Sequence, residues 1–204
     1  MMKRQMGWLA LALVLAGCAG PRGGMTLPPP LAARAVVLQP GEPGYDRARI
    51  DAAVKAPGQG GVSEGVVIRL AEDLPVWRLW NGPGRVDARG HTNRLGGWWS
   101  HDAPRGTVQA YRAAYEICLG WNELRWVARC TLKAGTVVVV GPGQSVSPQT
   151  CGDGSGLERY EANARDWQLY LDQPWSRGSE LVCPEESADY EADPDELSRP
   201  KRTS

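Results

Sequence analysis

The feature that most constrains the fold of this chain is a series of short apolar runs separated by turns. The runs are too short for long helices and suit strands, and the 25 glycines and 16 prolines supply residues that end strands and form turns. We predict strands over six ranges: Gly65–Arg69, Val76–Trp80, Gly97–Ser100, Leu124–Lys133, Thr136–Val140 and Trp167–Leu171.

One segment among these runs has the spacing of a helix. Thr107 can cap its N-terminus, and one buried stripe follows: Val108, Tyr111, Ala114, Tyr115 and Cys118. Because strands outnumber helices, the predicted class is α+β, with a small mixed or antiparallel sheet and few helices. The run from Leu124 to Leu132 alternates in polarity, which turns Cys130 inward and Arg125 and Arg129 outward.

The N-terminus is typical of a signal peptide. Lys3 and Arg4 precede an apolar run over residues 7–16, which is too short to be a stable membrane span. The following Leu15-Ala16-Gly17-Cys18 resembles the bacterial lipobox, in which the cysteine is acylated. The resemblance implies a signal peptide over residues 1–17 and a lipid anchor on Cys18 in a bilayer. Ala19 after the cysteine favours the outer membrane.

Four other cysteines stand in the chain: Cys118, Cys130, Cys151 and Cys183. An even number in an oxidising compartment predicts two disulfides. Of the three pairings, Cys118 with Cys130 and Cys151 with Cys183 is the most economical, because each bond then closes one contiguous loop. The spacing of a zinc knuckle is absent, so we predict no metal site.

Composition predicts how the rest of the chain is organised. The range 18–61 reads as a lipidated cysteine, a Pro/Gly-rich tether and a short helix at Asp46–Lys55. We predict a globular domain over residues 62–184 and a mostly disordered tail over the acidic range 185–204. The 23 basic residues balance 23 acidic ones, which excludes nucleic-acid binding through bulk charge.

Arg78 is the first candidate for a binding residue. It lies in the middle of Val76–Trp80, whose other members are typical of a buried strand, and a buried guanidinium needs an anionic partner. That partner is either a ligand or an internal carboxylate, unless Arg78 faces solvent on an edge strand. The basic, glycine-rich range 81–97 follows and is either a loop that closes over a phosphorylated ligand or a solvated loop.

Aromatic and amide side chains add further candidates. Trp98 and Trp99 are adjacent on a strand and so must face opposite ways, one toward the core and the other free to stack on a ligand ring, unless loops cover both. Gln168 lies on the polar face of its strand, where such a residue is usually only surface. No hydrolase motif is present.

Five short segments in this order resemble one protein family: 74–80, Gly97–Ser100, Tyr111-Arg112, 132–141 and Gln168–Tyr170. They are similar to the NAD-cleaving toxin domains of the tuberculosis necrotizing toxin type, small members of the wider ADP-ribosyltransferase fold. The likeness runs from Leu74 to Leu171.

The resemblance implies an ADP-ribosyltransferase-like fold and NAD as a substrate, with no resident cofactor. It assigns Arg78 to the pyrophosphate, Trp99 with Ser100 to the nicotinamide ribose, and Gln168 to the ribose hydroxyls as the catalytic residue. A neutral Gln168 cannot act as a general base, which favours transfer to water. The alternative is a non-catalytic envelope protein that acts as a binding or interaction module.

Overall fold

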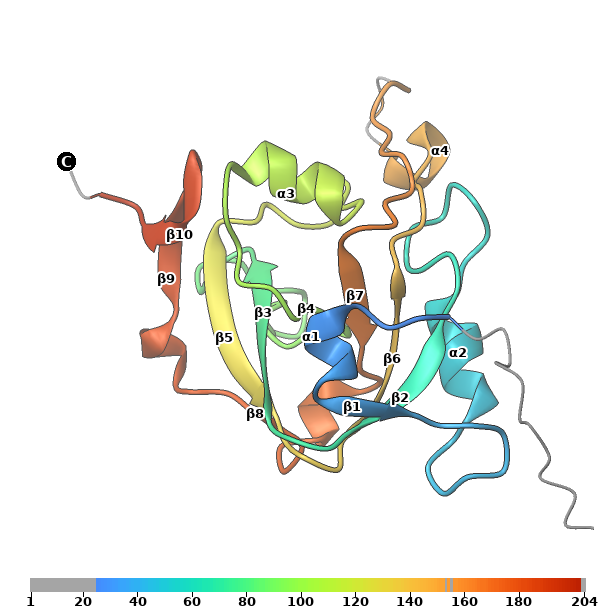
Figure 1. The fold of residues 1–204 in the computed structure, drawn as a ribbon. Helices are drawn as coiled ribbons and strands as arrows, with labels where there is room; N and C mark the ends of the chain where they lie inside the picture. The colour runs from blue at the N-terminus through green and yellow to red at the C-terminus, as the bar shows by residue number, and fades with distance from the viewer. Residues whose placement is uncertain (1–24, 153, 155, 203–204) are drawn as a thin grey trace, which may run out of the picture.

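The computed structural model describes residues 25–152, 154 and 156–202. The described chain forms one large antiparallel sheet in the strand order β1-β2-β6-β7-β4-β3-β5-β9-β10, with β8 paired to β5 (Figure 1). The strands are β1 Ala35–Val37, β2 Val66–Leu70, β3 Leu74–Trp80, β4 Trp98–Ser100, β5 Trp126–Leu132, β6 Val137–Pro142, β7 Trp167–Tyr170, β8 Leu181–Val182, β9 Tyr190–Asp193 and β10 Glu196–Pro200. The helices are α1 Pro29–Ala32, α2 Arg47–Ala53, α3 Val108–Ala114 and α4 Pro148–Cys151, with 3-10 turns at Pro174–Ser176 and Glu186–Ala188. The α+β class is confirmed.

The six predicted strands are β2 to β7, each displaced by at most two residues at either end. The predicted helix is α3, but it ends at Ala114, before Tyr115 and Cys118 of the predicted stripe. The hydroxyl of Thr107 accepts a hydrogen bond from the backbone N–H of Ala110 at 3.1 Å, which makes it the N-cap. The short helix predicted at Asp46–Lys55 is α2, capped by Asp46.

Both faces of the sheet are buried. One face carries a cluster that includes Ile68, Val138 and Cys130, and α1 adds Leu31 to it. The other face carries two clusters, one beneath α2 at one end of the sheet and one beneath α3 at the other. This double burial explains why all of β6 is buried instead of alternating.

The expected tether is partly corrected. Leu27 and Leu31 are buried in the main cluster, and β1 pairs antiparallel with β2 at the edge of the sheet. The apolar side chains among the prolines and glycines pack against one face of the sheet. A prediction from composition does not detect such a contact. Residues 25–61 therefore belong to the folded domain.

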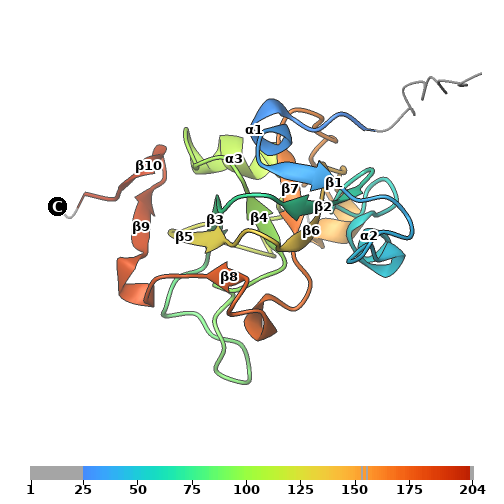
Figure 2. The same cartoon turned by 60° about the horizontal axis from the view of Figure 1, so that its bottom comes forward.

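The expected disordered tail over 185–204 is also corrected. Strand β9 pairs with β5, β10 pairs with β9, and Leu197 is fully buried beneath the sheet's second face. Three of its acidic side chains form ion pairs: Asp189 with Arg94, Asp193 with Arg199 and Glu191 with Lys201. Figure 2 shows β9 and β10 at the edge of the sheet opposite to β1 and α2. Arg94 comes from a distant segment, and the burial of Leu197 and the strand pairing also depend on distant contacts, so local charge alone misled the prediction.

Two disulfides are present, but the predicted pairing is wrong. Cys118 bonds Cys151, and Cys130 bonds Cys183. The inward position of Cys130 is confirmed, and the β5–β8 register sets its partner, because the preceding pairs align residues 132 with 181 and 131 with 182. The next position aligns Cys130 with Cys183. Tertiary pairing, not loop economy, decided the connectivity.

The predicted signal peptide and Cys18 lie outside the described residues. Among the residues that the structure describes, no helix has the length and apolarity needed to cross a bilayer.

Candidate functional site: a pocket between two buried clusters

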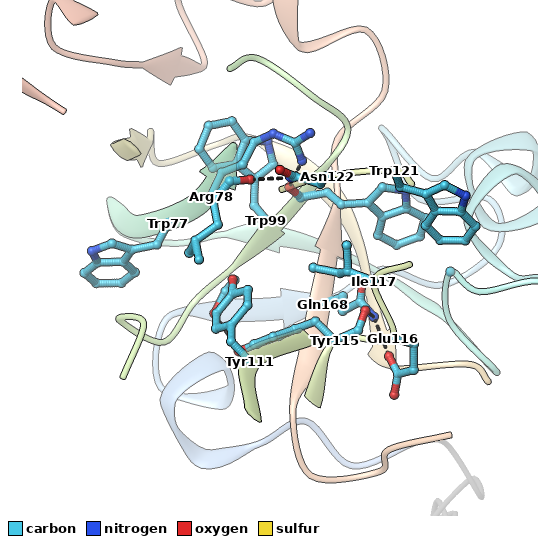
Figure 3. Close-up of a pocket in the computed structure, with 14 residues that line it drawn as sticks. Trp77, Arg78, Trp99, Tyr111, Tyr115, Glu116, Ile117, Trp121, Asn122 and Gln168 are labelled. Atoms are coloured by element: carbon cyan, nitrogen blue, oxygen red, sulfur yellow. Dashed lines mark hydrogen bonds between the residues drawn. The ribbon is translucent and has the colours of Figure 1, made fainter. Parts of the chain in front are cut away.

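A pocket opens in the gap between the α2 and α3 clusters (Figure 3). Its volume of about 180 Å³ exceeds the roughly 150 Å³ of engineered cavities that bind benzene, so an aromatic ring fits inside. Strands β3, β4 and β7 form the floor, and α3 with the loop after it forms a wall. The lining residues are Gly61, Trp77, Arg78, Leu79, Trp98, Trp99, Ser100, Tyr111, Tyr115, Glu116, Ile117, Trp121, Asn122 and Gln168.

The sheet register places two of the predicted residues, Ser100 and Gln168, on one face, and Arg78 and Trp99, which alternate with this row, on the other. Trp77 of β3 pairs with Ser100 of β4, which pairs with Gln168 of β7. Directly paired residues point to the same face, so these three form one row across the floor. Strands β3 and β4 pair only at this position within the described chain, and the pocket lies where they separate. All four predicted residues, Arg78, Trp99, Ser100 and Gln168, line this pocket.

Arg78 is held by backbone carbonyls. Its Nε donates to the carbonyl of Asn93 at 3.1 Å, and its Nη1 donates to the carbonyl of Trp98 at 2.8 Å. Within the described residues it forms no ion pair with a carboxylate, and burial lowers its pKa to about 10. Its Nη2 makes no hydrogen bond to a described residue and is not enclosed. The internal-carboxylate alternative is therefore excluded within that part of the chain, where Nη2 lies against Gly96.

Gly96 makes room for this guanidinium. A Cβ built on Gly96 would lie 2.2 Å from Nη2 and 2.4 Å from Cζ of Arg78. The carbonyl of the same residue accepts a hydrogen bond from the indole N–H of Trp99 at 2.7 Å. Gly96 thus fixes Trp99 and leaves space for Arg78, and no larger residue can do both without moving Arg78.

For the basic loop at 81–97, the two alternatives were a loop that closes over a phosphorylated ligand and a solvated loop. Arg94 makes two hydrogen bonds to Asp189, at 2.6 and 2.9 Å, and Arg85 forms an ion pair with Glu123. Arg89 and His91 are exposed, and their backbone N–H groups donate to Asp87. Two of the loop's cations are therefore neutralised within the protein, and Arg78 is the cation that lines the pocket.

The two adjacent tryptophans face opposite ways, as predicted. Trp99 is 3% exposed and packs in the main cluster, so only a small part of it reaches the pocket. Trp98 lies on the other face and packs against Tyr170, with ring centroids 4.9 Å apart. Trp98 therefore offers more ring surface to a ligand than Trp99, the residue that the resemblance singled out.

The hydroxyl of Ser100 is already satisfied by the protein. It donates to the carbonyl of Asp102 at 2.7 Å, accepts from the backbone N–H of Asp102 at 3.0 Å, and lies 2.7 Å from the Tyr115 hydroxyl. Burial raises the pKa of Tyr115 to about 12, so this phenol is neutral and can donate to Ser100. Ser100 thus anchors the tyrosine wall and has little hydrogen-bonding capacity left for a ligand.

Glu116 is a pocket residue that the sequence predictions missed. Its side chain follows α3, is 2% exposed, and accepts a hydrogen bond at Oε2 from Nε2 of Gln168 at 3.0 Å. Its Oε1 is buried without a hydrogen-bond partner, and burial raises its pKa to about 9. A signal was present in the sequence: an acidic residue stands between Tyr115 and Ile117 near a helix C-terminus, where the dipole disfavours it.

The loop after α3 completes the pocket wall. Asn122 donates from Nδ2 to the carbonyl of Leu79 at 2.7 Å, and its Oδ1 accepts from the backbone N–H of Leu124 at 3.0 Å. Trp121 is 45% exposed at the mouth. The disulfide from Cys118 ties this loop to α4. An exposed indole on a tethered loop can stack on a ligand ring.

Comparison with protein-family models, with curated proteins and with solved structures finds no match. Among the described residues, no three His, Cys, Asp or Glu side chains cluster to hold a metal ion. The site itself is therefore the basis for assigning a function.

Proposed function

We propose that this pocket binds a nucleotide and that its substrate is NAD, cleaved at the nicotinamide–ribose bond. The observation that carries the proposal is the convergence of Arg78, Trp99, Ser100 and Gln168 on one pocket. These residues come from three separate segments, and the resemblance to NAD-cleaving domains of ADP-ribosyltransferase-like fold requires them to meet.

Each chemical part of NAD has a matching group in the pocket. The diphosphate accepts hydrogen bonds from Arg78, whose Nη2 is unused by described residues. The aromatic rings stack on indole surface, for which Trp98 and Trp121 are available. The ribose hydroxyls donate to the amide oxygen of Gln168.

In the proposed reaction, water is the acceptor. The C–N bond between ribose and nicotinamide breaks, and its electron pair passes to the ring nitrogen, which leaves as neutral nicotinamide. A water oxygen bonds to the ribose carbon, and its proton passes to solvent. The pocket contributes by holding the diphosphate and the ribose, because an oxocarbenium-like centre does not need a strong nucleophile.

A second candidate is a non-catalytic binding module. It is favoured by the state of the polar groups in the pocket: the hydroxyl of Ser100 is used within the protein, and burial keeps Glu116 and Tyr115 neutral at pH 7. Such a pocket holds a ligand through Arg78 and stacking, but it offers no general base at neutral pH.

One experiment distinguishes the two candidates. The protein is incubated with NAD, free nicotinamide is measured by chromatography, and NAD binding is measured by calorimetry. Nicotinamide release that is lost in Gln168→Ala supports the enzyme, and binding without release supports the binding module. The absence of both would refute a NAD site.

We also propose that the domain is held at a bacterial outer membrane by acyl chains on Cys18. The L-A-G-C sequence supports this location. We expect Cys18→Ser to leave the protein as unprocessed precursor or to release it into the soluble envelope fraction. Membrane fractionation checks this result, and a variant that processes and fractionates like the parent would contradict the anchor.

A further inference from the structure

The amide of Gln168 has a fixed orientation. Its Nε2 donates to Oε2 of Glu116 at 3.0 Å and lies 3.4 Å from the backbone carbonyl of Tyr115. A backbone carbonyl can only accept, so the NH2 end of the amide must face this side. The amide oxygen makes no hydrogen bond to a described residue and is not among the enclosed polar atoms.

The backbone of Glu116 adopts an unfavourable conformation. Its φ of 48° lies in the left-handed region, which is unfavourable for a residue other than glycine. Gly143 makes the space for its carboxyl group, because a Cβ at Gly143 would lie 2.1 Å from Oε2. Strained backbone and a glycine-lined recess together bring a carboxyl group against Gln168, and strain of this kind gathers at functional sites.

Glu116 can accept the hydrogen bond from Gln168 in both of its protonation states. Burial raises the pKa of Glu116 to about 9, so the group is largely neutral at pH 7. With the proton on Oε1, Oε2 is a carbonyl oxygen and still accepts from Gln168. The hydrogen bond therefore does not depend on ionisation.

We infer that Glu116 is a positioning residue for Gln168: together with the Tyr115 carbonyl, it turns the amide so that the pocket presents an oxygen acceptor. The ligand group that fits this oxygen is a hydrogen-bond donor, as a sugar hydroxyl is. A phosphate or carboxylate oxygen at the same point is rejected, because two acceptors would face each other. The inference rests on the proposed nucleotide site and specifies what Gln168 selects there.

The first test needs no ligand. The side-chain amide signal of Gln168 is assigned by NMR from its absence in Gln168→Ala, and its hydrogen exchange is compared between variants. We expect Glu116→Leu, which removes the acceptor, to speed exchange, whereas Glu116→Gln restores slow exchange because its amide oxygen can accept. Glu161→Leu, at an exposed site, serves as the control. Equal exchange in all folded variants overturns the inference.

The second test uses binding. Affinities are measured by calorimetry for NAD and for an analogue whose nicotinamide ribose lacks its hydroxyls. We expect Glu116→Leu to weaken NAD binding about tenfold, equivalent to about 1.4 kcal/mol, and to leave binding of the analogue unchanged. Glu116→Gln should stay within about threefold of the parent, a loss below about 1 kcal/mol. Equal weakening for both ligands would mean a general structural role and would overturn the inference.

The two tests fail in different ways. A parent protein that binds neither ligand refutes the proposed function, while the exchange experiment still decides the role of Glu116. If Glu116→Leu does not fold, the amide signal of Gln168 in the parent is followed through pH 9. It should titrate there and become flat in Glu116→Gln, with Glu161→Gln, at an exposed site, unchanged from the parent. A signal flat in the parent overturns the inference.

Discussion

Arg78→Met separates a ligand-binding arginine from a structural one. The substitution keeps the apolar stem and removes a guanidinium that donates to the carbonyls of Asn93 and Trp98. No described carboxylate pairs with Arg78, so the change leaves no buried charge behind. The cost to stability should therefore be far smaller than the roughly 3–5 kcal/mol typical of breaking a buried ion pair.

The magnitude follows from two opposing effects. Two hydrogen bonds from a charged donor contribute about 1.5–3 kcal/mol each. Against this, the fall in the pKa of Arg78 from 12.5 to about 10 corresponds to about 3 kcal/mol of lost solvation, which the substitution recovers. The net loss should be about 1–2 kcal/mol, or a fall in Tm of about 2–8 °C.

The effect on a diphosphate ligand should be larger. Losing a charge-assisted, partly desolvated contact costs about 1.5–3 kcal/mol, so NAD affinity should fall about 10- to 150-fold. Thermal melts with and without NAD, together with calorimetry, measure both quantities. Arg47→Met, at an exposed arginine in α2, is the matched control and should change neither. A loss of stability above about 4 kcal/mol, or unchanged affinity in a parent that binds NAD, would refute the reasoning.

The remaining predictions perturb other parts of the pocket and fold. Gly96→Ala should weaken NAD binding as Arg78→Met does while retaining the arginine, because the new Cβ occupies the place of the guanidinium. Calorimetry measures the affinity, and a parent-like value would contradict the prediction. Cys118→Ser combined with Cys151→Ser should lose about 4 kcal/mol in the chain-entropy model and should weaken binding by freeing the pocket loop, as denaturant unfolding and titration would show. Deleting residues 185–204 should lower the Tm and expose apolar surface, whereas a disordered tail would be removed without effect. Glu116→Gln should flatten the pH dependence of stability between pH 4.5 and 9. In the folded parent Glu116 stays protonated over this range while in the unfolded chain it ionises, so the parent loses up to about 1.4 kcal/mol of stability per pH unit as pH rises. Urea unfolding at several pH values measures this, and parallel profiles for parent and variant would disprove the assignment.

Local pattern was sufficient for the central elements of the fold. The strands β2 to β7 and the helices α2 and α3 follow from periodicity and from caps at Thr107 and Asp46, because those signals lie within a few neighbouring residues. The inward position of Cys130 follows from strand alternation in the same way. The position of an arginine amid apolar neighbours likewise indicated Arg78 as a candidate, and Arg78 lines the pocket.

Contacts between distant segments decided everything else. The Cys130–Cys183 bond depends on the β5–β8 register, and the ordered C-terminus depends on Arg94 reaching Asp189 across 95 positions. The role of Glu116 appears only when the chain brings it against Gln168, 52 residues away. The sequence alone determined which segments are strands or helices, because hydrophobic period and capping are local. Only the tertiary structure determined which strands adjoin and which charges meet, because pairing energy depends on partners that no local window contains.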